Sequence, residues 1–94
     1  MKAARTDANH TALVQAYKDA GWSVLSLAKV GDGCPDLLLC DRTRTRLHLV
    51  EVKTETGRLT PDQAIFSLCW PVRVVRSVED VRQHVQAVTE SVSS

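Results

Sequence analysis

The stretch PDLLLCDRTRTRLHLVEVK, residues 35–53, decides the fold of this chain. Two apolar runs with strand character flank a polar segment that predicts a hairpin turn. A turn centred on this segment places Leu38 opposite Leu49. The same register places Asp36 opposite Glu51, so two carboxylates end one apolar hairpin.

Charge spacing at this end of the hairpin predicts a metal site. Strand side chains alternate, so Glu51 and Lys53 project from one face and Val52 from the other. Opposed residues have Cβ atoms about 5 Å apart, where like charges are destabilising. A divalent cation between Asp36 and Glu51 would remove this penalty. The alternative is a solvated strand start and strand end, paired with Lys53 in an ordinary salt bridge.

Patterns on either side of the hairpin predict an α/β domain. Thr60 is the expected N-cap of a helix with Pro61 first and Gln63 closing a capping box. The order α-β-β-β-α-β-α predicts one mixed four-stranded sheet with helices on its faces. The expected ranges are helix 10–20 (capped by Asp7 or Asn9), strands 22–28, 37–39 and 47–50, helix 61–70, strand 72–76 and a helix from 78, capped by Ser77.

The last helix carries an apolar stripe that packs on its own sheet or serves a dimer, namely Val78, Val81, Val85 and Val88. From Thr89 onward the chain is Ser-rich, and we expect a frayed tail. One domain is expected over 1–94, with a core over about 8–88 and a flexible tail over 89–94. Trp22 and Trp70 are expected in the core.

Composition is that of a soluble globular protein, with 44% hydrophobic and 24% charged residues. No apolar run approaches the roughly 20 residues of a membrane span, and the N-terminus lacks the apolar stretch of a signal peptide. Three cysteines without a CxxC pair predict free thiols in a reducing compartment, the cytoplasm. The net charge of +1 requires local patches, or a dimer, for nucleic-acid binding.

In this strand context, Asp36 followed by Glu51-Val52-Lys53 resembles the PD-(D/E)XK nuclease superfamily. The resemblance is closest to small phage and archaeal Holliday-junction-resolvase-like members, including the VRR-NUC group. It spans about residues 5–85 and implies a restriction-endonuclease-like αβββαβ core with an extra C-terminal helix. The supporting strings are GCPDLL (33–38), LVEVK (49–53), LTPDQ (59–63) and VRVVRS (72–77).

The resemblance also implies roles for individual residues. Asp36 and Glu51 would ligate Mg²⁺ or Mn²⁺, with the backbone carbonyl of Val52 as a further ligand. Lys53 would orient the attacking water or stabilise charge on the phosphate, and Gln63 would help to position water or lysine. The implied activity is metal-dependent endonucleolytic hydrolysis of DNA, selective for branched DNA such as a four-way junction. A homodimer in the cytoplasm of a bacterial or phage-infected cell is expected.

One position departs from the resembled pattern. Many members carry a glutamate in the first helix about eleven residues before its terminal glycine, and counting back from Gly21 gives His10. Histidine ligates metals as a neutral imidazole but favours softer ions than Mg²⁺. Either His10 replaces that glutamate as a ligand or water-orienting group, or a second metal position is missing.

Basic residues outside this set are candidates for contact with the nucleic-acid backbone, although a run such as the hairpin arginines is usually a solvated turn. They are Lys29, Arg42, Arg44, Arg46 and Arg58. His48 and His84 have no partners at metal-ligand spacing and are expected to be structural or exposed. Two other functions remain open: a nuclease acting on flapped or single-stranded DNA or on RNA, and a non-catalytic nucleic-acid-binding module of the same fold.

Overall fold

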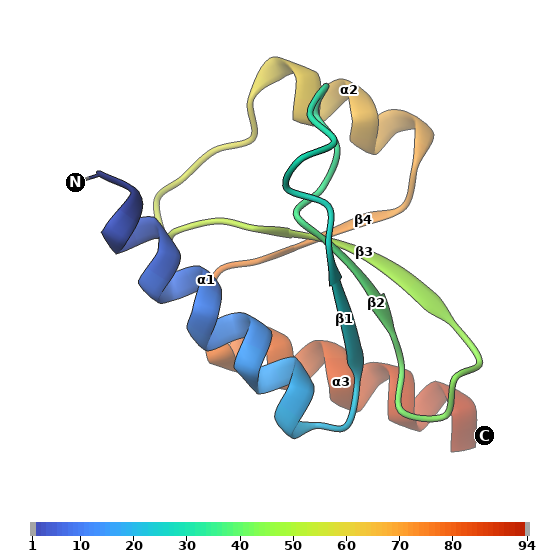
Figure 1. Ribbon diagram of the computed structural model, residues 1–94. Helices are drawn as coiled ribbons and strands as arrows, with labels where there is room; N and C mark the ends of the chain where they lie inside the picture. The colour runs from blue at the N-terminus through green and yellow to red at the C-terminus, as the bar shows by residue number, and fades with distance from the viewer. Residues whose placement is uncertain (1, 94) are drawn as a thin grey trace.

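A computed structural model describes residues 2–93, and side chains for residues 8–91 (Figure 1). One mixed four-stranded sheet has the order β1-β2-β3-β4, antiparallel except for the parallel pair β3–β4. The predicted α/β fold, with three helices and this sheet, is confirmed. The elements are α1 (Lys2–Asp19), β1 (Ser23–Ser26), β2 (Leu37–Cys40), β3 (Leu47–Val52), α2 (Pro61–Cys69), β4 (Val72–Val75) and α3 (Val78–Ser93).

Register in the β2–β3 hairpin agrees with the sequence pattern. Leu38 pairs with Leu49 and Leu37 with Val50, so the next position outward brings Asp36 toward Glu51. The hairpin turn is closed at its other end by Asp41, which is only 3% exposed.

The carboxylate of Asp41 accepts hydrogen bonds within the turn. Its Oδ1 atom accepts from the backbone N–H of Thr45 at 3.1 Å and from the hydroxyl of Thr43 at 2.9 Å. Arg44 adopts the left-handed conformation, with φ of 61°. The polar segment therefore forms a self-contained turn that fixes the pairing of the two strands.

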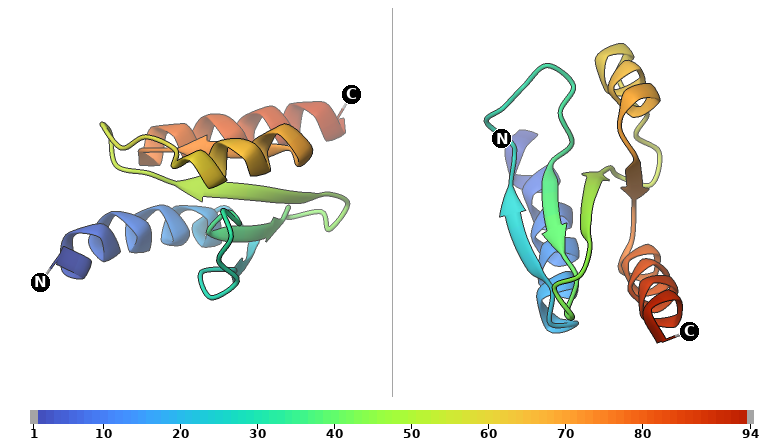
Figure 2. Two further views of the ribbon diagram at one scale, coloured as in Figure 1. Left: turned by 90° about the horizontal axis from the view of Figure 1, so that it is seen from above. Right: turned by 90° about the vertical axis from the view of Figure 1, so that its right-hand side faces the viewer.

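The core lies between the sheet and the pair α1–α3, which pack against each other (Figure 2). Alternation sends one side chain in two from each strand into this core. The valine stripe of α3 packs here, with Val81 and Val88 buried and Val78 and Val85 partly buried. The buried apolar set is Leu13, Tyr17, Trp22, Leu37, Leu39, Val50, Val75, Val81 and Val88.

Two predicted helix boundaries are wrong. α1 begins at Lys2, so Asn9 lies inside the helix and neither Asn9 nor Asp7 caps it. α3 continues past Thr89 to Ser93, and the Thr89 hydroxyl donates to the Val85 carbonyl at 2.9 Å within the helix, whereas the flexibility expected of residues 89–94 stays a prediction. Polar residues extend both helices because a helix already held by a buried face tolerates them at its solvated ends.

α2 differs from the other helices because none of its residues is buried. It crosses from β3 to the parallel strand β4 and stands apart from α1 and α3 in Figure 1. Trp70, expected in the core, is 54% exposed and stacks on Phe66 with ring centroids 5.7 Å apart. Within residues 2–93, no helix combines the length and apolarity needed to cross a membrane.

Candidate active site

Asp36 stands immediately before β2 and is held by backbone contacts. Its carbonyl accepts a hydrogen bond from the Leu27 amide at 2.7 Å, which extends the β1–β2 ladder. Its Oδ2 atom accepts from the backbone N–H of Val52 at 2.8 Å. In a strand, the N–H and C=O of one residue point to the same side, so the Val52 carbonyl is also directed toward the β2 side.

The loop before Asp36 passes close to the start of α2. Gly33 has φ of 79°, and a Cβ atom at this position would collide with the backbone of Asp62. Only glycine combines this backbone conformation with such a close approach. The glycine in the GCPDLL string therefore lets the Asp36 loop and α2 meet at one end of the sheet.

Glu51 is the buried carboxylate of the site, with 3% of its surface exposed. Its Oε2 atom accepts a hydrogen bond from Gln63 Nε2 at 3.0 Å and lies 3.5 Å from the Lys53 ammonium. Its Oε1 atom is buried without a hydrogen-bond partner. A buried polar atom without a hydrogen-bond partner is costly, and a cation bound at this oxygen would remove that cost.

Electrostatics at Glu51 favour an additional positive charge. Burial, and then the nearby Asp36 carboxylate, raise the pKa of Glu51 from 4.5 to about 7. The Lys53 ammonium acts in the opposite direction and offsets only part of this effect. A divalent cation between the carboxylates would stabilise both in their ionised form.

Gln63 makes hydrogen bonds both within the N-terminal cap of α2 and to the buried carboxylate of Glu51. Its backbone N–H donates to the Thr60 hydroxyl at 3.2 Å, and its Oε1 atom accepts from the Thr60 N–H at 2.9 Å. This confirms the predicted capping box of α2. The remaining Nε2 group donates to Glu51, so the first turn of α2 fixes the orientation of the buried carboxylate.

One cavity of about 250 Å³ brings the predicted catalytic residues together. Among the described side chains, no three His, Cys, Asp or Glu residues converge to hold a metal ion. A cation at Asp36 and Glu51 would therefore draw its other ligands from carbonyl oxygen and water, as hard cations commonly do. The cavity is lined by Asn9, His10, Asp36, Glu51, Val52, Lys53, Thr54 and Gln63.

Asn9 is the residue that sequence reasoning missed as part of the site. Its side-chain amide donates to the Lys53 carbonyl at 3.2 Å and so ties α1 to the end of β3. Asn9 lies four residues before Leu13 and eight before Tyr17, on the apolar stripe of α1. The position of Asn9 on this apolar stripe was the sequence signal that its side chain faces the interior of the domain.

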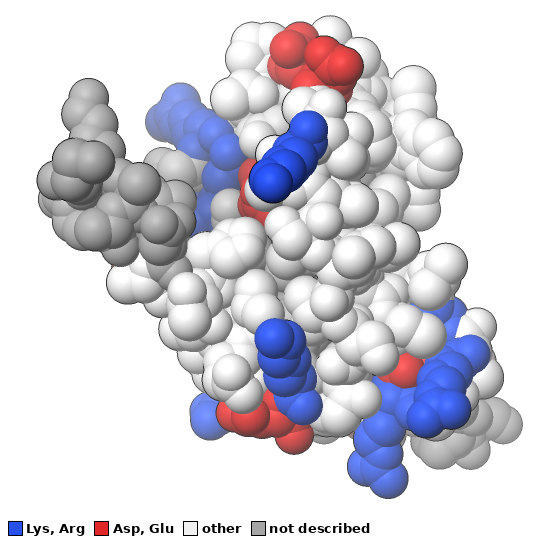
Figure 3. All heavy atoms as spheres, viewed as in Figure 1, with Lys and Arg blue, Asp and Glu red and all other residues white. Residues whose placement is uncertain are grey.

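The predicted nucleic-acid contacts lie outside this cavity. Figure 3 shows Lys and Arg side chains gathered at the end of the molecule where the β2–β3 hairpin turns. There, Arg42, Arg44 and Arg46 are exposed, at the opposite end of β3 from Lys53. Lys29 and Arg58 are also exposed, on the connections that lead to Asp36 and away from Lys53.

The fold and the site define a class of protein: an α/β domain with two carboxylates and a lysine at one end of its sheet, consistent with the PD-(D/E)XK superfamily. The sequence model of the VRR-NUC domain matches residues 2–68, and the chain belongs to this family. It is accordingly a nuclease-type domain. No curated protein and no solved structure matches the chain.

Proposed function

We propose that this chain is a Mg²⁺- or Mn²⁺-dependent endonuclease that hydrolyses phosphodiester bonds in DNA. The observation that carries the proposal is the unpartnered Glu51 Oε1 atom, buried beside the second carboxylate of Asp36. A buried carboxylate with one oxygen lacking a hydrogen-bond partner, beside the half-buried carboxylate of Asp36, fits a hard divalent cation. Membership of a nuclease family supports the chemistry that would follow.

Asp36, Glu51 and the Val52 carbonyl are the proposed ligands, and His10, which lines the same cavity, is a candidate for orienting water. When bound, such an ion activates water and neutralises charge on the phosphate.

Lys53 provides a positively charged side chain beside the proposed metal ligands, which are two carboxylates and a carbonyl. Its ammonium lies on the Glu51 face of β3, 3.5 Å from Oε2, and its backbone is held on both sides. The Lys53 N–H donates to the Val75 carbonyl at 3.0 Å, and its carbonyl accepts from Asn9. A point charge fixed in this way is suited to a phosphoryl oxygen in the transition state.

The test compares four DNA substrates: a four-way junction, a linear duplex, a flap and a single strand. Each is incubated with Mg²⁺, Mn²⁺ or EDTA, with the wild type and with Lys53→Ala. Lys18→Ala is the matched control, because Lys18 is an exposed lysine on α1. Metal-dependent cutting that is lost only in Lys53→Ala is expected, and equal cutting by both variants would refute the assigned role.

We further propose branched DNA as the preferred substrate. The hairpin arginines lie at one end of β3 and the cleavage residues at the other, so a single strand of the sheet links two contact points on DNA. Phosphate contacts at the arginines would position the substrate without reading its sequence. We expect paired nicks in the four-way junction alone. Faster cutting of the flap or of the single strand would show that this DNA structure, and not the junction, is the preferred substrate.

We also propose a homodimer, supported by the exposed apolar surface of α2. Ile65 is 61% and Leu68 86% exposed on this short helix, and Trp70, at its C-cap, is 54% exposed, which is unusual for large apolar side chains. Sedimentation equilibrium should give twice the chain mass for the wild type and a lower mass for Leu68→Asp. Leu47→Asp, at an exposed leucine of the hairpin, is the control. A monomeric wild type would refute the dimer.

His10 is the observation that favours a second candidate, a DNA-binding module without catalysis. It occupies the cavity at the position where the resembled nucleases carry glutamate. Calorimetric titration with Mn²⁺ separates the two functions. Binding that weakens in Asp36→Asn supports the nuclease, whereas DNA binding without any metal binding supports the module.

A further inference from the structure

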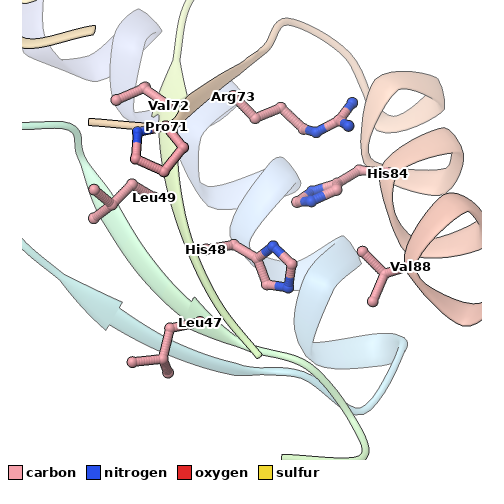
Figure 4. A pocket seen from close by; sticks show the side chains of 8 residues that line it. All are labelled: Leu47, His48, Leu49, Pro71, Val72, Arg73, His84 and Val88. Carbon is pink, nitrogen blue, oxygen red and sulfur yellow. The ribbon is translucent and has the colours of Figure 1, made fainter. Parts of the chain in front are cut away.

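A second cavity, of about 330 Å³, lies where β3 extends beyond the first residue of β4. Figure 4 shows three polar side chains lining it from three elements: His48 from β3, Arg73 from β4 and His84 from α3. Pro71 and Val72 are part of its apolar wall. His48 projects from the opposite face of β3 to Glu51, so this cavity is separate from the candidate active site.

His84 presents one ring nitrogen to this cavity. It is 3% exposed, and its Nδ1 atom lies 2.8 Å from the Tyr17 hydroxyl. Burial raises the pKa of Tyr17, so the hydroxyl keeps its proton. In the tautomer of neutral His84 in which Nδ1 accepts a hydrogen bond from this hydroxyl, Nε2 carries the ring proton and is a donor.

His48 adds a second, incompletely satisfied ring. Its Nε2 atom is buried without a hydrogen-bond partner, 3.9 Å from Asp41 Oδ2. The rings of His48 and His84 are edge to face, with centroids 5.0 Å apart. The two imidazoles and the guanidinium of the exposed residue Arg73 therefore line one cavity, and each of the three groups can act as a hydrogen-bond donor.

The charge of the cavity selects an anion over a metal cation. Burial, and then the Arg73 guanidinium, lower the pKa of His84 to about 4. Burial also lowers the pKa of His48, with Asp41 opposing this effect and Arg46 and Arg73 adding to it. A site in which arginines already disfavour protonated histidine would disfavour a metal cation and attract an anion.

We propose that this cavity binds a phosphoryl group, held by the Arg73 guanidinium and by the ring nitrogens of His84 and His48. A fork of guanidinium donors with further donors from other directions matches a tetrahedral oxyanion. The apolar wall at Pro71 and Val72 provides room for an organic part, so the phosphoryl group belongs to a nucleotide, either free or within a nucleic-acid chain. The binding does not depend on cleavage at Asp36 and Glu51.

The test follows the ring resonances of the two histidines by NMR while sulfate is added, since sulfate keeps its charge across the working pH range. Saturable shifts are expected at His84 and His48, with affinity reduced about tenfold or more in Arg73→Gln. Arg82→Gln is the control, at an exposed arginine of α3 that pairs with Glu79. Unsaturable shifts, or equal affinity in Arg73→Gln, would overturn the proposal.

A second readout separates binding from a merely structural role. Sulfate should raise the pKa of His84 from about 4, and its affinity should increase as the pH falls. An unchanged His84 pKa at saturating sulfate would overturn the proposal. The charged or titratable groups that face the two imidazoles, and so belong in this titration, are Tyr17, Asp41, Arg46 and Arg73.

Competition identifies the source of the phosphoryl group. A mononucleotide that displaces sulfate supports a free nucleotide, and a short duplex that displaces it supports the nucleic-acid backbone. If neither competes, the assignment to phosphoryl groups is overturned. Because no arm requires cleavage, failure here and failure of the proposed nuclease activity are distinguishable.

Discussion

Two carboxylates, each 3% exposed, are buried at the two ends of the β2–β3 hairpin. Burial alone would raise the pKa of Asp41, but hydrogen bonds from the Thr45 backbone and from the hydroxyls of Thr43 and Thr45 lower it below its usual value. At the other end, burial and Asp36 raise the pKa of Glu51 to about 7. The same degree of burial thus gives opposite shifts.

The difference lies in how completely each carboxylate is satisfied. Asp41 is surrounded by donors that belong to its own turn, so its charge closes the hairpin. Glu51 has one oxygen held by Gln63 and one without a partner, next to a second acid. A buried carboxylate with a raised pKa and one oxygen that lacks a hydrogen-bond partner is typical of functional sites.

Replacing Glu51 by Gln should have the largest effect. We expect a loss of metal-dependent cleavage of roughly 10³-fold, since several kcal/mol of charge stabilisation are removed. DNA binding should remain, and a fluorescence anisotropy assay run beside the cleavage assay checks this. Cleavage by Glu51→Gln at the wild-type rate would show that the open oxygen has no role in catalysis.

Gln63→Ala should come next, with Thr60→Ala as its matched control. Both remove the capping box, at a cost of about 1 kcal/mol in the free energy of unfolding. Only Gln63→Ala also releases Glu51, so it alone should reduce cleavage, by about 10- to 100-fold. Equal activities for the two variants would mean that Gln63 only caps α2.

The pH dependence of stability should distinguish the two carboxylates without any assay of activity. The folded pKa of Glu51, about 7, lies above its ordinary 4.5, so the folded state keeps a proton that the unfolded state releases. This contribution is complete below pH 4.5 and is lost as the pH rises through 7, by about 1–2 kcal/mol once screening is allowed for.

His84 changes the free energy of unfolding in the opposite direction. Its folded pKa of about 4 lies below its ordinary 6.5, so the unfolded state binds a proton more readily and the folded state becomes more stable as the pH rises. The quantity to measure is therefore the difference between wild type and Glu51→Gln in chemical denaturation, without metal. A difference that does not vary between pH 4.5 and 8 would contradict the raised pKa.

Asp41→Asn should have the smallest effect on activity. Cleavage should stay within about twofold of the wild type, because the change lies at the far end of the hairpin from Lys53. Thermal unfolding should nevertheless occur a few degrees lower, because a charged acceptor of the turn is lost. A large loss of cleavage without a change in melting temperature would contradict the assignment of Asp41 to the stability of the turn and of Glu51 to catalysis.

The hairpin register and the capping box were predictable from sequence because both depend on residues close together in the chain. The alternation of residues 37–40 and 47–52 leaves one register that buries the apolar face. Thr60 and Gln63 are three residues apart, so their reciprocal hydrogen bonds need no tertiary information.

Features that depend on distant contacts were not predictable. His48 and His84 are 36 positions apart and meet because the β3–α2–β4 crossover brings α3 under the sheet. Trp70 lies at the C-cap of α2 and is exposed, and α2 itself has no buried residue, although its apolar composition predicts burial. The helical start of α1 likewise reflects packing of the whole helix rather than a local cap.

The exposed helix α2 has a kinetic consequence for the site. Its amides are protected by few buried contacts, so its first turn should open far more often than the whole domain unfolds. Gln63 belongs to that turn, and each opening releases Glu51. The lifetime of a single hydrogen-bonded turn therefore limits how long the site stays assembled, and amide exchange at residues 63 and 64 measures it directly.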